Sequence, residues 1–258
     1  MGRSSWPRAA PFKALAALGS LIVLMSGAPG AARAAQPAAT EPPLLAPLAA
    51  PDPARPGAPW RFEGLPDQTL PKTRFSMVES DAGRALRVES DASYGNLVHA
   101  FESPPPAAPV LSWTWRVDRP AAGVDLRERA ADDTAIKVCA FYDPPQHSIP
   151  WFERLLLQAA RAATGRDLPG ATVCYVWDQT IRAGSILANV YTSRMRWIVL
   201  RSADTPLGSW VRERRDLAED YRAAFEAPMP PLVGIAVGAD TDNTGARALA
   251  LIADLELR

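Results

Sequence analysis

Histidine and cysteine are scarce in these 258 residues, with two of each, and their scarcity excludes several kinds of chemistry. The only histidines are His99 and His147, and neither has a carboxylate, a cysteine or the other histidine at metal-ligand spacing, so we expect no zinc site. Gly-x-Ser-x-Gly elbows and glycine-rich phosphate-binding motifs are missing, which argues against the usual esterases and nucleotide-binding enzymes. Without a catalytic signature, we expect binding more than catalysis.

Long apolar runs are missing beyond the N-terminus. Residues 14–25 are apolar, a run of about a dozen residues that follows Arg3, Arg8 and Lys13 and precedes small residues. This pattern predicts a signal peptide over residues 1–34, and the alternative is a retained membrane anchor. Since no later stretch reaches spanning length, we expect a periplasmic or secreted product with no stable membrane span after cleavage.

The charge of the expected mature chain excludes another class of partner. The sequence has 28 basic and 28 acidic residues. Four basic residues and no acidic residue precede position 35, which leaves 24 against 28, or −4, for the remainder. A mildly acidic domain lacks the basic surface that holds a polyanion, so nucleic acid is not an expected partner.

Proline, with alanine between, punctuates residues 35–59. Such a segment favours extended conformations and has little to bury, so it predicts a linker. We expect one globular domain over residues 60–258, since the hydrophobic content of 48% is enough for a sizeable core.

Short strand-like runs recur after the linker, separated by turn residues. Residues 110–117 alternate apolar with polar side chains, 232–237 are continuously apolar, and 248–257 place leucines on one face. Further strands are expected over residues 60–63, 74–78, 85–89, 96–101, 135–142, 172–177, 193–200 and 210–214. The pattern predicts a mainly β fold, a two-sheet antiparallel β-sandwich of jelly-roll type.

Two segments have helical spacing and are expected as short inserted helices. Residues 149–163 repeat apolar side chains at helical intervals, and Gly165 follows them. Residues 217–225 follow Asp216, a good N-cap, and carry acidic residues in the first turn.

The cysteines, Cys139 and Cys174, lie inside two of the expected strands. In an oxidising compartment they can form a disulfide if their Cα atoms come within about 7 Å. The alternative is two buried free thiols. Neither cysteine lies in a nucleophile motif, so a catalytic thiol is not expected.

Several of these motifs together resemble a bacterial family known as domain of unknown function 3047. The resemblance covers most of the chain from Trp60 onwards and implies a secreted β-rich domain, but no reaction. The sequence departs from the family at Lys137, where arginine is expected, and at Cys174, where a polar residue is expected. The stretches that carry the resemblance are residues 113–117, 132–138, 175–177, 215–225 and 239–245.

The loop at residues 240–245 carries Asp240, Asp242 and Asn243 before a glycine. Oxygen ligands at this spacing suit calcium, but the twelfth position is Leu251 where a complete calcium loop has glutamate. The alternative is a tight turn between strands, because Asp, Asn and Gly favour turns. Calcium is therefore a candidate ligand, and no cofactor is required.

A second polar cluster surrounds the start of the strand expected at 135–142. The even spacing of Asp133 and Lys137 puts both on one face of a strand, and Asp132 is adjacent. With Tyr175 or Trp177 from a neighbouring strand, they would line a concave polar-aromatic surface suited to sugars. The alternative is a buried ion pair with core tryptophans.

These observations favour an exported, non-catalytic binding module for a glycan or another cell-envelope component. One alternative is a hydrolase acting on a polysaccharide, which needs two carboxylates about 5 to 10 Å apart. Another is an envelope assembly protein that pairs through an exposed sheet edge. The acids that hydrolysis would draw on are Asp132, Asp133, Asp178 and Asp220.

Overall fold

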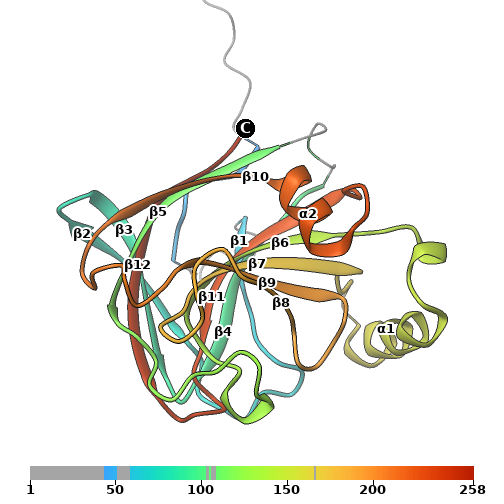
Figure 1. Cartoon of the computed structure of the whole chain (residues 1–258), viewed down its shortest axis with the longest axis horizontal. Helices are drawn as coiled ribbons and strands as arrows, with labels where there is room; N and C mark the ends of the chain where they lie inside the picture. Colours follow the sequence, from blue (N-terminus) through green and yellow to red (C-terminus); the bar gives the residue numbers. More distant parts are fainter. Residues whose placement is uncertain (1–43, 51–58, 103–104, 106–108, 166) are drawn as a thin grey trace, which may run out of the picture. The chain divides into compact units, whose positions relative to one another are not determined.

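Two β-sheets face each other in the computed structural model, which describes residues 44–50, 59–102, 105, 109–165 and 167–258 (Figure 1). The predicted signal peptide and most of the predicted linker lie outside these ranges. Within them, no helix is both long and apolar enough to cross a membrane.

The first sheet has seven strands in the order β1-β4-β11-β6-β7-β9-β8. Neighbouring strands are antiparallel except β7 and β9, which run parallel. The strands are β1 (Trp60–Glu63), β4 (Tyr94–Ala100), β6 (Thr134–Tyr142), β7 (Ala171–Trp177), β8 (Ile186–Ala188), β9 (Met195–Arg201) and β11 (Leu232–Asp240).

The second sheet has five antiparallel strands in the order β10-β5-β12-β3-β2. The hairpin between β2 and β3 turns at Gly83, whose φ of 86° is open to glycine and strained for other residues. The strands are β2 (Arg74–Ser80), β3 (Gly83–Asp91), β5 (Val110–Arg119), β10 (Val211–Asp216) and β12 (Arg247–Leu257).

The main core lies between the two sheets, where alternate residues of each strand point inward. Along β5, Trp113 and Trp115 are fully buried while their neighbours in sequence are only half-buried. The ring of Trp113 lies 5.3 Å from that of Tyr175 on β7, and the ring of Trp115 lies 6.0 Å from that of Trp177. The predicted two-sheet β-sandwich is confirmed, and this alternation is its cause.

Within the described ranges, two α-helices and two short 3-10 helices complete the fold. Helix α1 (Trp151–Thr164) lies between β6 and β7 in sequence, and α2 (Leu217–Phe225) follows β10 directly. The Asp216 carboxylate accepts hydrogen bonds from the backbone N–H groups of Ala218 at 2.9 Å and Glu219 at 3.0 Å, and so caps α2. The 3-10 helices are Arg129–Ala131 and Gln146–Ser148.

A second apolar cluster lies on the other face of the seven-stranded sheet. Cys139 and Cys174 are direct partners across β6 and β7, and a disulfide joins them with a Cα–Cα distance of 4.0 Å. Trp197 of β9 packs in this cluster together with Leu126 and Ile181 from loops that cover part of the face. The uncovered part of this face carries the site described below.

Residues 44–50 pack on the domain, so the prediction of a linker that buries little is wrong for this stretch. Leu45 is buried, and the Trp60 indole N–H donates to the carbonyl groups of Ala46 at 3.1 Å and Pro47 at 3.0 Å. The Ala46 N–H in turn donates to Nε2 of His99 at 3.3 Å. Burial of Leu45 and the hydrogen bonds from the Trp60 indole hold this stretch on the domain, although it contains Pro47.

Candidate functional site

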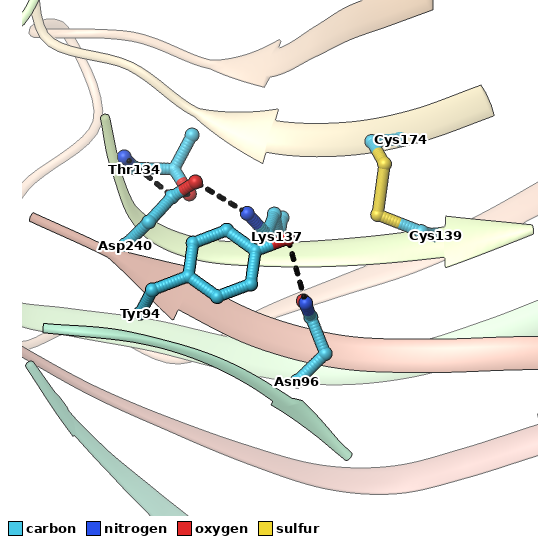
Figure 2. Close-up of a disulfide and its surroundings, with 7 residues drawn as sticks. All are labelled: Tyr94, Asn96, Thr134, Lys137, Cys139, Cys174 and Asp240. Carbon is cyan, nitrogen blue, oxygen red and sulfur yellow. Dashed lines mark hydrogen bonds and ion pairs between the residues drawn. A yellow bond between two sulfur atoms is a disulfide. The ribbon is translucent and has the colours of Figure 1, made fainter. Parts of the chain in front are cut away.

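A buried ion pair lies at the centre of the site. Lys137 projects from β6 and donates from Nζ to Oδ2 of Asp240, at the end of β11, at 2.6 Å (Figure 2). The other Asp240 oxygen accepts hydrogen bonds from the backbone N–H and the hydroxyl of Thr134, at 3.0 and 2.6 Å. Burial by itself would lower the pKa of Lys137, but the charge and hydrogen bond of Asp240 together with the charges of Tyr94 and Asp132 outweigh it, and the pKa lies above its usual value.

Two aromatic rings flank this ion pair. Lys137 Nζ lies 5.1 Å from the centre of the Tyr94 ring and 5.9 Å from that of Trp197. Figure 2 shows the Tyr94 ring beside the Lys137 amine, on the strand next to β11. Such cation–π contacts add to the carboxylate in holding the ammonium group in place.

A cavity of about 360 Å³ opens above the ion pair. Its walls combine three aromatic rings with acids, amides and a few apolar groups, which is the mixture typical of small-ligand sites. The lining residues are Leu65, Tyr94, Asp132, Lys137, Asn189, Tyr191, Met195, Trp197, Asp240, Asp242 and Asn243.

Asp132 is the acid of the cavity whose ionisation is most perturbed. Its side chain is buried, and Asn189 Nδ2 donates to Oδ2 at 2.9 Å. Burial, together with the negative charge of Asp240, raises its pKa to about 6. Burial and the charge of Asp240 also raise the pKa of Asp242. Both carboxyl groups therefore hold protons at higher pH than exposed aspartates do.

Three lining residues have a buried polar atom with no hydrogen-bond partner within the described ranges. These atoms are Oδ1 of Asp132, Oδ1 of Asp242 and Nε1 of Trp197. Two are acceptors and one is a donor. The site therefore combines unmet acceptor and donor capacity with aromatic walls.

The structure separates the residues that the sequence grouped as a sugar-binding surface. Lys137 pairs with Val176 across β6 and β7, so Tyr175 and Trp177, one position to either side, point to the opposite face. Both rings lie in the inter-sheet core, and the Tyr175 hydroxyl donates to Asp220 at 2.7 Å. The prediction that Tyr175 or Trp177 lines the surface with Lys137 is wrong, because strand faces alternate with period two.

Asp133 also has a different place from the one predicted. It precedes β6, is fully buried and accepts hydrogen bonds from the backbone N–H groups of Asn243 at 3.2 Å and Thr244 at 2.7 Å. The Thr244 hydroxyl donates to it at 2.6 Å. Asp133 therefore fixes the turn after β11, and of the predicted cluster only Asp132 and Lys137 line the cavity.

The loop considered for calcium is held by protein hydrogen bonds. Asp240 is bound to Lys137 and Thr134, and the Asn243 amide donates to Asp133 and to the Asp132 carbonyl. In the part of the chain that the structure describes, no three or more His, Cys, Asp or Glu side chains are arranged to hold a metal ion. Calcium at Asp240, Asp242 and Asn243 stays a prediction.

The two remaining acids that hydrolysis would draw on lie in structural roles. Asp178 accepts from the backbone N–H groups of Thr180 at 2.7 Å and Ile181 at 2.6 Å, which closes a turn. Asp220 binds Arg215 and the Tyr175 hydroxyl. The residues missed by sequence reasoning, Tyr94, Asn189, Tyr191 and Trp197, come from three separate segments with no shared motif.

Comparison with protein families gives one match, in which the family described as protein of unknown function (DUF3047) covers residues 58–256. No curated protein matches the chain.

Solved structures give similarities at low sequence identity. A family 11 carbohydrate-binding module from Clostridium thermocellum, in complex with a β-1,3-1,4-mixed-linked tetrasaccharide, is 8% identical, with 77% of this chain and 88% of that chain covered and a TM-score of 0.39. The xyloglucanase domain of NopAA from Sinorhizobium fredii, in complex with cellobiose, is 8% identical, with 78% and 98% covered and a TM-score of 0.40. Endoglucanase 3 of Trichoderma harzianum, from family GH12, is 6% identical, with 78% and 96% covered and a TM-score of 0.35.

Proposed function

This chain belongs to the DUF3047 family, and from that premise we propose that it is an exported, non-catalytic module that binds a neutral glycan in the cavity over the seven-stranded sheet. The observation that carries the proposal is the set of unmet polar atoms on Asp132, Trp197 and Asp242. Buried polar groups are nearly always hydrogen-bonded, so this cavity suits a ligand that both donates and accepts.

A sugar has the chemistry that these walls require. Its hydroxyl groups donate to carboxylate oxygens and accept from an indole N–H, and its C–H faces pack on aromatic rings. Tyr191, whose side chain is exposed at the mouth, and Tyr94 supply such rings. Together they match a ligand that is polar at its edges and apolar on its faces.

The charge of the cavity supports a neutral ligand. Lys137 is the lining cation, and Asp240 neutralises it at 2.6 Å, which leaves the carboxyl groups of Asp132 and Asp242 uncompensated. Among the described residues that line the cavity there is no further cation, so a phosphate or a uronic acid would meet like charge; Arg129 lies outside the lining, with its guanidinium 5.4 Å from the centre of the Tyr191 ring. A neutral sugar avoids that repulsion.

The disulfide supports export. Disulfides persist mainly in oxidising compartments such as the periplasm and the extracellular space, and Cys139 and Cys174 are bridged. The signal peptide predicted over residues 1–34 is the device that would deliver the chain there.

Titration with a panel of neutral oligosaccharides, followed by calorimetry and by the fluorescence of Trp197 and its neighbours, tests the proposal. We expect Tyr191→Ala to weaken binding about tenfold, because one stacking ring is removed. Tyr191→Phe keeps the ring, and Leu207→Ala, at an exposed site outside the cavity lining, is the matched control. Failure of the whole panel to bind, or equal weakening by Leu207→Ala, would contradict the proposal.

A second candidate function is glycan hydrolysis, and the raised pKa of Asp132 favours it. A carboxyl group with a pKa of about 6 is suited to act as a general acid near neutral pH, with Asp242 as the second carboxylate. In that case the wild type releases new reducing ends from a bound oligosaccharide, and Asp132→Asn binds the oligosaccharide without releasing them. Binding without product release by the wild type identifies the non-catalytic module.

A further inference from the structure

Helix α1 exposes its apolar face to solvent. Trp151, Phe152, Leu155 and Leu156 have exposed fractions of 71%, 55%, 55% and 51%, while Leu157 is the buried residue of the helix. Their spacing follows one side of the helix over its first two turns. The apolar periodicity that predicted a helix here therefore does not mark a core-facing side.

The polar side of α1 faces the domain instead. Glu153 pairs with Arg194 at 3.7 Å and accepts a hydrogen bond from Ser193, and Arg161 donates from Nε to the Leu168 carbonyl at 2.8 Å. A surface helix normally turns its apolar side inward. The reversal leaves a contiguous apolar surface on α1, beside the ends of β7 and β9 (Figure 1).

A second cavity of about 430 Å³ lies between α1 and residues 188–194. Phe152 and Leu156 form its wall on α1, and Ala188 and Val190 contribute further apolar groups. Glu153 and Arg194, which also line it, neutralise each other. The cavity therefore carries no net charge, and its walls combine these apolar groups with polar side chains from residues 189–193.

The two cavities adjoin, because Asn189 and Tyr191 line both. The first holds the unmet polar atoms of Asp132, Trp197 and Asp242, and the second is bordered by Phe152 and Leu156, which belong to the exposed apolar face of α1. An amphiphilic ligand would place a sugar in the first and a chain in the second.

We propose that the ligand is a glycolipid, whose sugar occupies the cavity over Lys137 and Asp240 and whose hydrocarbon chain lies in the groove between α1 and residues 188–194. This inference rests on the proposed function, because the sugar is placed in the same cavity. The two lining residues that the cavities share carry it, together with the apolar side chains of Phe152 and Leu156 and the lack of net charge in the groove.

The test uses alkyl glycosides of the neutral sugar bound in the panel, with chains of four to ten carbons, below their micelle concentrations. We expect affinity to rise roughly threefold per added methylene until the groove is filled, because each methylene leaves water for an apolar wall. Leu156→Gln and Phe152→Gln should flatten this rise while the free sugar binds as tightly as to the wild type. Leu155→Gln, on the same helix but outside the cavity lining, should preserve the rise.

The outcomes separate this inference from the proposed function. Binding of free sugar with no dependence on chain length overturns the glycolipid and leaves the glycan module standing. Absence of binding by free sugars and alkyl glycosides alike overturns both. Equal binding to phosphatidylcholine vesicles with and without a glycolipid also overturns the inference, because α1 would then contact the membrane itself.

Discussion

Lys137 and Asp240 form an ion pair in which the two side chains are 5% and 9% exposed. Removing one charge leaves the other buried without compensation, and such changes destabilise proteins by about 3–5 kcal/mol. We expect Asp240→Asn to lower the free energy of unfolding in urea by this amount. Adding Lys137→Met should recover at least half of the loss, because no uncompensated cation then remains.

The partly exposed pair between Arg87 and Glu89, at 2.9 Å, is the matched control, and exposed Arg74 lies 3.9 Å from the same carboxylate. Its side chains are 40% and 28% exposed, so Glu89→Gln should change the free energy of unfolding by about 1 kcal/mol or less. Equal losses of unfolding free energy in Asp240→Asn and Glu89→Gln would show that burial does not determine how much the Lys137–Asp240 pair contributes to stability.

Asp132 predicts a pH-dependent stability difference. Its pKa is raised from 3.8 to about 6 in the folded state, so the folded protein binds the proton more tightly than the unfolded chain does. Protonation of Asp132 therefore adds to the free energy of unfolding; this contribution is complete below pH 4 and is lost as the pH rises through 6. Asp132→Asn mimics the protonated acid and should become more stable than the wild type, by roughly 3 kcal/mol at most, as the pH rises from 4 to 7.5.

Urea unfolding of both proteins across this range measures the difference, and other titrating groups cancel in the comparison. A difference that stays constant from pH 4 to 7.5 would show that Asp132 titrates at its ordinary value.

The fold was largely predictable, because alternation and turn residues are local signals. Strand β5 illustrates this, since its buried and half-buried residues follow the alternation visible in residues 110–117. Strand β8, Ile186–Ala188, was missed because three residues are too few to show a period.

The site was only partly predictable, because it depends on which strands are neighbours and in which register. One signal was nevertheless present. Cys139 lies two residues after Lys137, and Cys174 lies two residues before Val176. A disulfide between them puts Lys137 and Val176 on one face, and Tyr175 and Trp177 on the other. Tyr94 and Trp197 join the site through long-range strand pairing, and Tyr191 joins it from the loop before β9; no local pattern encodes either placement.

The disulfide itself predicts a measurable contribution to stability. Cys139 and Cys174 are separated by 35 positions, and closing a loop of that length stabilises the folded state by about 4 kcal/mol in the chain-entropy model. The Cys139→Ala, Cys174→Ala double variant should lose this amount in urea unfolding. Dithiothreitol should lower the stability of the wild type towards that of the variant and leave the variant unchanged. No effect of the reductant on the wild type would contradict the bridge.

His99 predicts that the packed segment at residues 44–50 loosens in acid. Its Nε2 accepts from the Ala46 N–H, and a protonated imidazole has no acceptor left, while burial lowers the pKa of His99. Because the folded pKa lies below the unfolded value, this contribution is complete above about pH 6.5 and is lost as the pH falls through the folded pKa. The hydrogen-exchange protection of the Ala46 amide should therefore fall in acid.

Since Asp132 acts in the opposite direction on global stability, this local measurement isolates His99. His99→Gln keeps an acceptor that does not titrate, so the protection of the Ala46 amide should stay constant with pH in this variant. The control is the Thr241 amide, which donates to the Ser93 carbonyl at 2.8 Å; its protection should stay constant in the wild type and in the variant. If Ala46 and Thr241 lost protection together, the domain would be opening as a whole and His99 would not control this segment.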